Sequence, residues 1–245
     1  MVDASALVIP RFHDVLGDVM AHGHTHYWLH GGRGSTKSSF ISVCIVLLIL
    51  ANPEANAVVV RRFSNTLRDS VFQQVTWAIA ELGLERWFRA RISPMEITYL
   101  PTGQRIVFRG ADDPLKLKGV KFTRGYCAVT WFEELDQFDG IDAVRSILNS
   151  LRRGGEDFWI FYSYNPPRTL WSWVNREKLD ELCSGEAILS FGSRATSTSS
   201  RATPNGWAGR SSRRRSTCAR WTSRRGARSI WARSRGRVAR SSTTS

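Results

Sequence analysis

Short apolar runs alternate with longer amphipathic stretches along the first 190 residues of the chain. The apolar runs predict buried strands at residues 27–29, 57–61, 126–132 and 158–163. The longer stretches predict helices at residues 37–50, 66–82 and 141–151, and a Pro-Thr-Gly turn predicts a hairpin over residues 96–109. This order favours an α/β fold in which helices cover both faces of a mainly parallel sheet.

A glycine-rich loop joins the first predicted strand to the first predicted helix. It follows the pattern G-x-x-x-x-G-K-[ST], except that Thr36 stands at the second glycine. Such a loop presents backbone N–H groups and a helix N-terminus to phosphate, while its lysine reaches the β and γ oxygens and its serine suits Mg²⁺. We therefore expect nucleotide binding by Gly31, Gly32, Arg33, Gly34, Ser35, Thr36, Lys37 and Ser38. The alternative is a flexible turn, but the apolar run at residues 40–50 indicates a helix buried beneath the loop.

Two adjacent carboxylates follow the predicted strand at residues 126–132. Nucleotide phosphates lie at the carboxyl ends of strands in parallel sheets, which makes Glu133 and Glu134 a Walker B arrangement. Glu133 is expected to hold Mg²⁺ together with Ser38, although Asp is usual at this position and Glu is one methylene longer. Glu134 is expected to orient or deprotonate the attacking water. The alternative is a pair of solvated acids at the start of a helix.

The last predicted strand ends in Ser163, Tyr164 and Asn165, followed by two prolines. A polar pair at a strand end is well placed to sense a γ-phosphate. Taken alone, Asn-Pro-Pro is equally typical of a turn without chemistry.

In this order and spacing, the three motifs resemble the ATPase domain of the large subunit of tailed-bacteriophage DNA-packaging terminases, particularly the PBSX-like group. The resemblance covers about residues 20–190 and includes the run Trp-Phe-Glu-Glu-Leu-Asp-Gln-Phe at 131–138. It implies a RecA-like P-loop ATPase that uses ATP and Mg²⁺. It also implies that Lys37, Glu134 and Arg33 are catalytic, with Arg33 stabilising transition-state charge in cis. Ser163, Tyr164 and Asn165 would form the motif that couples hydrolysis to movement.

The resemblance further implies a motor subunit that packages double-stranded viral DNA into a capsid. Its partners would be DNA, a small terminase subunit, the capsid portal and copies of itself in a ring. Another RecA-like DNA-dependent ATPase and an inactive truncated product with a DNA-binding tail stay open as alternatives. Arg61 and Arg62 end a strand near the site, and the sequence leaves open whether they pair with phosphate or with acids.

The tail at residues 191–245 contains 14 arginines and no Lys, Asp or Glu, so the net charge of +14 resides there and residues 1–190 are balanced. This composition predicts disorder, because the segment cannot bury enough apolar area to offset the entropy of ordering. The tail is either a basic arm that binds phosphates or, as we favour, a coding region translated out of frame. Without carboxylates it cannot build the two-metal nuclease site that the resemblance would otherwise imply. The predicted domains are thus an ATPase domain at 1–190 and a tail at 191–245, with the nuclease domain absent.

No secretory signal precedes the domain, and the apolar run at residues 40–50 is too short to cross a bilayer. The expected location is the cytoplasm of an infected bacterial host.

Overall fold

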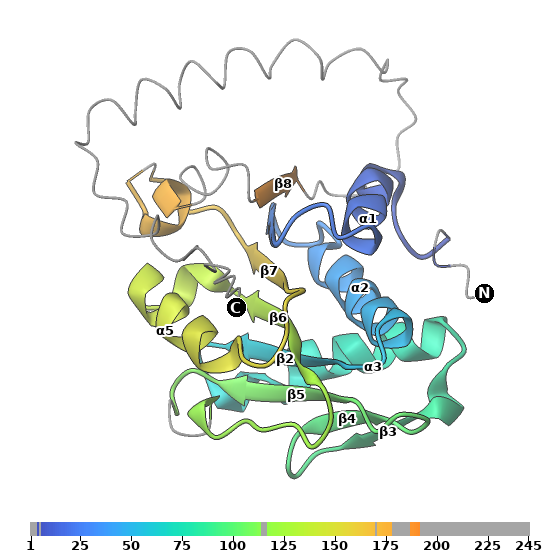
Figure 1. Ribbon diagram of the computed structural model, residues 1–245. Coiled ribbons are helices and arrows are strands. Elements are labelled where there is room, and N and C mark those ends of the chain that lie inside the picture. The colour runs from blue at the N-terminus through green and yellow to red at the C-terminus, as the bar shows by residue number, and fades with distance from the viewer. Residues whose placement is uncertain (1–3, 5, 114–116, 170, 178–186, 192–245) are drawn as a thin grey trace, which may run out of the picture. The chain divides into compact units, whose positions relative to one another are not determined.

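The computed structural model describes residues 4, 6–113, 117–169, 171–177 and 187–191. Within these residues, eight strands form one sheet in the order β3-β4-β5-β2-β6-β7-β1-β8 (Figure 1). The strands are β1 (His26–His30), β2 (Ala55–Arg61), β3 (Phe88–Arg91), β4 (Glu96–Tyr99), β5 (Arg105–Gly110), β6 (Tyr126–Glu133), β7 (Trp159–Tyr164) and β8 (Ala187–Phe191). The helices are α1 (His13–Met20), α2 (Lys37–Ala51), α3 (Gln73–Glu81) and α5 (Ile141–Leu151), with 3₁₀ turns at Pro10–Phe12, Ser64–Thr66, Glu85–Trp87 and Leu135–Gln137 and a π-helix at Arg68–Phe72.

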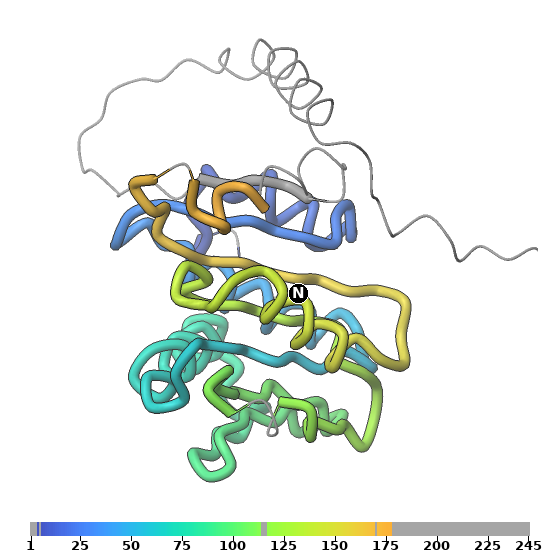
Figure 2. The backbone as a smooth tube through the Cα atoms, turned by 90° about the vertical axis from the view of Figure 1, so that its left-hand side faces the viewer, coloured from blue at the N-terminus to red at the C-terminus, as the bar shows by residue number. Residues whose placement is uncertain are grey.

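The sheet is parallel from β5 through β8, and an antiparallel hairpin extends it at the β3 edge. In Figure 2 the blue segment with β1 lies toward one end of the stack, and the teal and green segment with β3, β4 and β5 lies at the other. Parallel pairing of β6 with β7 sets Glu133 beside Ser163, and pairing of β1 with β7 sets His30 beside Tyr164. The carboxyl ends of β1, β6 and β7, which precede the three predicted motifs, therefore lie side by side.

Each face of the sheet carries its own hydrophobic core, because successive strand residues point to opposite faces. On one face, Leu29, Val59 and Trp131 pack with helices α1, α2 and α3. On the other, alternate strand residues such as Val60 and Phe132 pack with α5. Helix α2 is apolar on all sides and almost wholly buried, which fits a helix enclosed by the sheet, α1 and α3. The predicted buried helix beneath the glycine-rich loop is thus confirmed.

Three features depart from the sequence-based expectation. The helix expected at residues 66–82 is a 3₁₀ turn, then the π-helix, and only then α3. The expected two-stranded hairpin carries a third strand, β3, whose alternating polar residues suit an edge. Strand β8 adds a further parallel partner to β1.

The chain divides into two units, residues 1–199 and 200–245, and all of the described residues belong to the first. The tail that was predicted to be disordered lies outside the described residues, apart from Phe191 at the end of β8. In the described part of the chain, no helix has both the length and the apolar character needed to span a membrane.

Candidate nucleotide-binding site

The glycine-rich loop runs from the end of β1 directly into α2. The Gly31 N–H donates to the Tyr164 carbonyl at 3.4 Å, which fixes the start of the loop against the end of β7. Gly34 and Thr36 adopt positive φ values of 74° and 59°, so the backbone bends sharply just before the helix begins. A bend of this kind that opens a helix is the geometry that binds phosphate, because N–H groups and the helix dipole converge there.

The Lys37 ammonium lies inside this bend. It donates to the carbonyls of Gly31 at 2.7 Å and Gly32 at 3.3 Å, and to the Ser35 hydroxyl at 2.8 Å. The Asn165 side-chain oxygen lies at 3.4 Å and also accepts. Burial lowers the pKa of Lys37, and the negative charge of Glu133 opposes that shift. The lysine is thus held by neutral oxygens and carries a charge that is poorly solvated.

The two predicted acids face the loop. Glu133 ends β6, and Glu134 adopts a left-handed backbone conformation with φ of 54° that turns the chain away from the strand. The Ser38 hydroxyl donates to Glu133 Oε1 at 3.5 Å, so the first residues of α2 touch the end of β6. Burial raises the pKa of Glu133, whereas Arg61, Ser38 and Lys37 oppose the rise.

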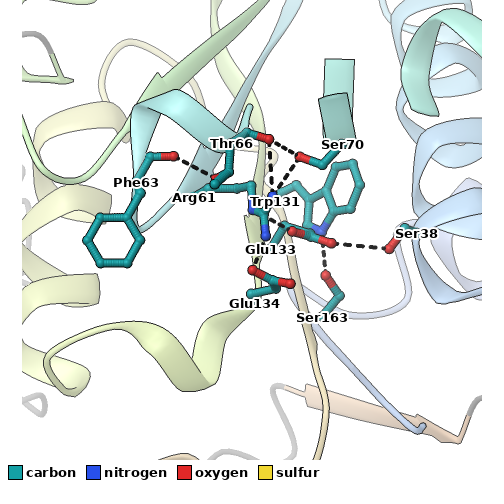
Figure 3. A network of polar contacts seen from close by, with 9 residues as sticks. All are labelled: Ser38, Arg61, Phe63, Thr66, Ser70, Trp131, Glu133, Glu134 and Ser163. Atoms are coloured by element: carbon teal, nitrogen blue, oxygen red, sulfur yellow. Dashed lines mark hydrogen bonds and ion pairs between the residues drawn. The ribbon is translucent and has the colours of Figure 1, made fainter. Parts of the chain in front are cut away.

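Arg61 binds both acids at once (Figure 3). Its Nε lies 2.8 Å from Glu133 Oε2, and its Nη2 pairs with Glu134 Oε2. Its side chain is 9% exposed, against 14% for Glu133 and 34% for Glu134. The question that the sequence left open is answered for this residue, because Arg61 pairs with the two site glutamates. Arg62 points elsewhere and pairs with Asp139 at 2.8 Å.

The residues expected to couple hydrolysis to movement lie against both motifs. The buried Ser163 hydroxyl accepts a hydrogen bond from the Trp131 indole at 2.8 Å, which ties β7 to β6 (Figure 3). Tyr164 holds Gly31, and Asn165 contacts Lys37. These contacts join the end of β7 to the loop and to the strand that carries the acids.

A cavity of about 350 Å³ lies between the loop and the strand ends. Its lining consists of Gly32, Arg33, Gly34, Ser35, Thr36, Lys37, Ser38, Ser39, Gln74, Glu133, Glu134, Ser163, Tyr164 and Asn165. Every site residue expected from the sequence except Gly31 therefore lines one cavity, and Gly31 contacts Lys37 from the base of the loop. Arg33 is exposed at the rim.

Sequence reasoning missed two lining residues, Ser39 and Gln74, and left the partner of Arg61 undecided. Gln74 reaches the cavity from α3 and donates to the Ser39 hydroxyl at 3.2 Å. No motif surrounds Gln74, so only its position on the helix face could have indicated a role. For Arg61 the signal was present, since a charged residue that ends a buried strand must find a partner.

The sequence of this chain matches the family model described as phage terminase large subunit over residues 23–216. The chain belongs to the phage terminase large subunit family. The match ends inside the segment that the composition assigns to the tail, so the domain boundary near residue 190 stays a prediction.

Two relatives in the terminase family are similar in sequence. The large terminase subunit of Bacillus phage SPP1 is 40% identical over 171 residues, which cover 68% of this chain and 40% of the SPP1 protein. The PBSX phage terminase large subunit of Bacillus subtilis strain 168 is 31% identical over 167 residues, which cover 68% of this chain and 36% of the relative. The chain thus spans less than half of the length of either terminase relative.

Solved terminase structures agree on the fold. The large terminase of a thermophilic bacteriophage superimposes with a TM-score of 0.63 at 15% identity, over 78% of this chain and 47% of that chain. The same thermophilic phage terminase has also been solved with ADP and with ATP-γ-S. The large terminase of bacteriophage HK97 gives a TM-score of 0.58 at 16% identity, over 88% of this chain and 47% of that chain. The terminase family and the RecA-like α/β fold expected from the sequence are confirmed.

Proposed function

We propose that this chain is the ATP-hydrolysing part of a terminase large subunit, which drives double-stranded viral DNA into a capsid. One observation carries the proposal: Lys37, Ser38, Glu133 and Glu134 line one cavity of about 350 Å³. A cationic loop on one side and two carboxylates on the other are what a triphosphate and its metal ion require. Family membership and the nucleotide complexes of the thermophilic phage terminase support the same function.

Each group at the cavity has a role in this proposal. The loop from Gly31 to Ser38 and the Lys37 ammonium bind the phosphates, for which Lys37 leaves its present carbonyl partners. Arg33 stabilises the charge that develops on the transferred phosphoryl group. Glu134 orients and deprotonates the attacking water. Ser163, Tyr164 and Asn165 transmit the change, because they contact both the loop and β6.

The donor set fits magnesium. Mg²⁺ prefers hard oxygen ligands and is commonly held by one or two carboxylates together with the phosphates of the substrate. The Ser38 hydroxyl and the Glu133 carboxylate approach each other at 3.5 Å, on the side of the loop where phosphates would lie. When bound, the ion would neutralise phosphate charge and polarise the bond to be broken. Among the described residues no cluster of three or more His, Cys, Asp or Glu side chains is present, so this site depends on the nucleotide as a ligand.

Domain organisation and partners are part of the proposal. Residues 1–190 form the ATPase domain, and residues 191–245 form a tail that, without Asp or Glu, supplies no nuclease site. The partners are duplex DNA, a small terminase subunit, the capsid portal and further copies of the chain.

Replacement of Lys37 by alanine tests the function directly. Lys37→Ala removes the only ammonium group that contacts the loop within the described residues, and ATP turnover should fall by roughly a hundredfold or more. Phosphate release is measured with and without duplex DNA, and circular dichroism verifies the fold. The exposed Lys118→Ala variant serves as the matched control and should keep parental turnover. Unchanged hydrolysis in Lys37→Ala would remove the assignment of the site.

A further inference from the structure

The three antiparallel strands at the β3 end of the sheet carry an excess of positive charge. Strands β3, β4 and β5 contain one carboxylate, Glu96, no Lys or Asp, and four arginines, Arg89, Arg91, Arg105 and Arg109. The five other strands together hold one arginine and one glutamate. Charge within the sheet is therefore concentrated in the teal and green strands at one end of the stack (Figure 2).

The strand register places the four arginines on one face of these strands. Arg89 lies opposite Thr98, which lies opposite Arg105, and residues directly opposite each other in antiparallel strands share a face. Arg91 comes two residues after Arg89, and Arg109 comes four after Arg105, so both keep to the same side. The other side of these strands packs in the core with α2 and α3. We call the surface formed by the four arginines the arginine face.

Glu96 is the one acid in these three strands, and it cannot balance the arginine face. Its side chain is 11% exposed and lies 3.3 Å from the Arg105 guanidinium and 3.8 Å from that of Arg91. A single arginine is enough to pair a buried carboxylate. Four positive charges against one negative charge leave a net charge of +3 on the arginine face.

Protection of the sheet edge explains only part of this charge. Charged side chains on an outer strand prevent edge-to-edge association, and the exposed Arg89 and Arg91 can serve this purpose on β3. Arg105 and Arg109 lie on β5, which is already paired on both sides by β4 and β2. Arg105 donates to the Lys121 carbonyl at 2.5 Å and still keeps 28% of its side chain exposed. The inner arginines therefore need another explanation.

The arginines also repel one another. Burial lowers the pKa of Arg109, the negative charge of Glu96 opposes that shift, and the positive charge of Arg105 adds to it. An anion bound on the arginine face would relieve this repulsion, because it would lie close to several guanidinium groups at once.

The size of the arginine face fits the backbone of one DNA strand. It extends about 13 Å along β5 from Arg105 to Arg109, and about 10 Å across the strands from β5 to β3. One strand of B-DNA carries a negative charge about every 3.4 Å along the helix axis, which gives about four phosphates over the longer dimension. Guanidinium groups bind phosphate through paired N–H donors, so the number and the type of charge both match.

We propose that the arginine face binds the phosphate backbone of duplex DNA. The contacts go to phosphate rather than to bases, so binding is independent of sequence and weakens steeply as salt is added. The inference rests on the proposed function, in which duplex DNA is what the motor moves. It extends that function by naming the surface that the DNA contacts.

Modification of arginines by phenylglyoxal in the full chain, read by mass spectrometry, tests the proposal without any substitution. Saturating duplex DNA should suppress modification of Arg89 and Arg91. The exposed Arg11 is the internal control and should react as it does without DNA, because the turn that holds it precedes α1 on the other face of the sheet.

The salt dependence of duplex binding provides a second measurement. The double variant Arg89→Gln/Arg91→Gln leaves Arg105 to pair with Glu96 and loses two phosphate contacts. The slope of log affinity against log salt should therefore fall by about 2, and affinity at about 0.1 M salt should fall roughly tenfold or more.

A second double variant, Arg11→Gln/Arg176→Gln, is the matched control. It removes the same charge from exposed positions outside the arginine face and should keep the parental slope. The 14 arginines of the tail are present in every sample, so differences between the variants do not arise from the tail.

Three results would overturn the proposal: full reactivity of Arg89 and Arg91 at saturating duplex, a parental slope in Arg89→Gln/Arg91→Gln, or the same loss of slope in both double variants. Protection by poly-glutamate but not by duplex would also overturn it and would identify an acidic protein as the partner. ATP turnover is measured in the same samples. Protected arginines without turnover would mean that the proposed function fails while the arginine face binds DNA, and turnover with reactive arginines would mean the reverse.

Discussion

At the scale of single residues, Thr36 shows what a deviation from the phosphate-loop pattern costs. The pattern has glycine at this position, and the structure gives the reason: the backbone there is left-handed, with φ of 59°. A β-branched side chain is strained in this conformation. The Thr36 hydroxyl is also buried without a hydrogen-bond partner. The deviation stiffens the loop but destabilises the resting protein.

Replacement of Thr36 by glycine should therefore stabilise the fold. Relief of left-handed strain contributes about 1–2 kcal/mol, and the greater freedom of glycine in the unfolded chain cancels about half of it. The net gain is expected to be about 0.5–1 kcal/mol in the free energy of unfolding, measured with urea and tryptophan fluorescence. Thr36→Ala keeps the unfavourable conformation and should gain less than the glycine variant. A loss of stability in Thr36→Gly would show that the threonine side chain makes a net favourable contribution.

At the scale of elements, the hydrogen bond between β6 and β7 is a structural link as well as part of the site. The Trp131 indole and the Ser163 hydroxyl are both almost fully buried, so neither can turn to water for a partner. Helix α2 offers a contrast at Ser42, which is also fully buried but whose hydroxyl has no hydrogen-bond partner. The two serines are matched in size and burial and differ in their hydrogen bonding.

Alanine variants of these serines should have opposite effects. Ser163→Ala leaves the indole N–H unsatisfied and should cost about 1–3 kcal/mol of stability. Ser42→Ala removes an unsatisfied hydroxyl from a helix and should be neutral or stabilising by up to about 0.5 kcal/mol. Thermal unfolding of both variants and the parent provides the measurement. Equal destabilisation by the two variants would mean that the Trp131 bond adds nothing beyond ordinary packing.

The sequence predicted those helices and strands that a local pattern of apolar residues determines. It did not predict features that depend on contacts between residues far apart in the chain. Helix α2 and strands β2 and β6 followed from their apolar runs, because burial on all sides leaves a continuous signal. The π-helix at Arg68–Phe72 did not follow from the local pattern, and this segment contacts Arg61 on the distant strand β2. In the site, sequence motifs identified the glycine-rich loop and the two acids, Glu133 and Glu134. The contact of the two acids with Arg61 and the approach of Gln74 to the cavity depend on how strands and helices assemble.

At the scale of the whole molecule, the two ends of the parallel strands differ in chemistry. The carboxyl ends carry the candidate site. Near the opposite ends of β1 and β7, His22 pairs with Asp157 at 3.5 Å and His24 contacts Asp18 at 2.9 Å. His26, at the start of β1, lies 3.0 Å from the Tyr162 hydroxyl and stacks on that ring. Protonation of His26 would therefore act on the sheet at the end remote from the candidate site.

Burial, helped by the positive charge of Arg152, lowers the pKa of His26 from 6.5 to about 4. Because the folded pKa lies below the unfolded one, the unfolded chain binds the proton first, and stability falls as the pH drops from about 6.5 to about 4. His26 alone should lower the free energy of unfolding by about 2 kcal/mol between about pH 7.5 and about pH 5.

His26→Gln retains hydrogen-bonding groups and does not titrate, so its stability should fall by about 2 kcal/mol less than that of the parent over this interval. Urea unfolding at both pH values measures the difference. The same decrease in His26→Gln as in the parent would show that His26 is not held neutral by the fold.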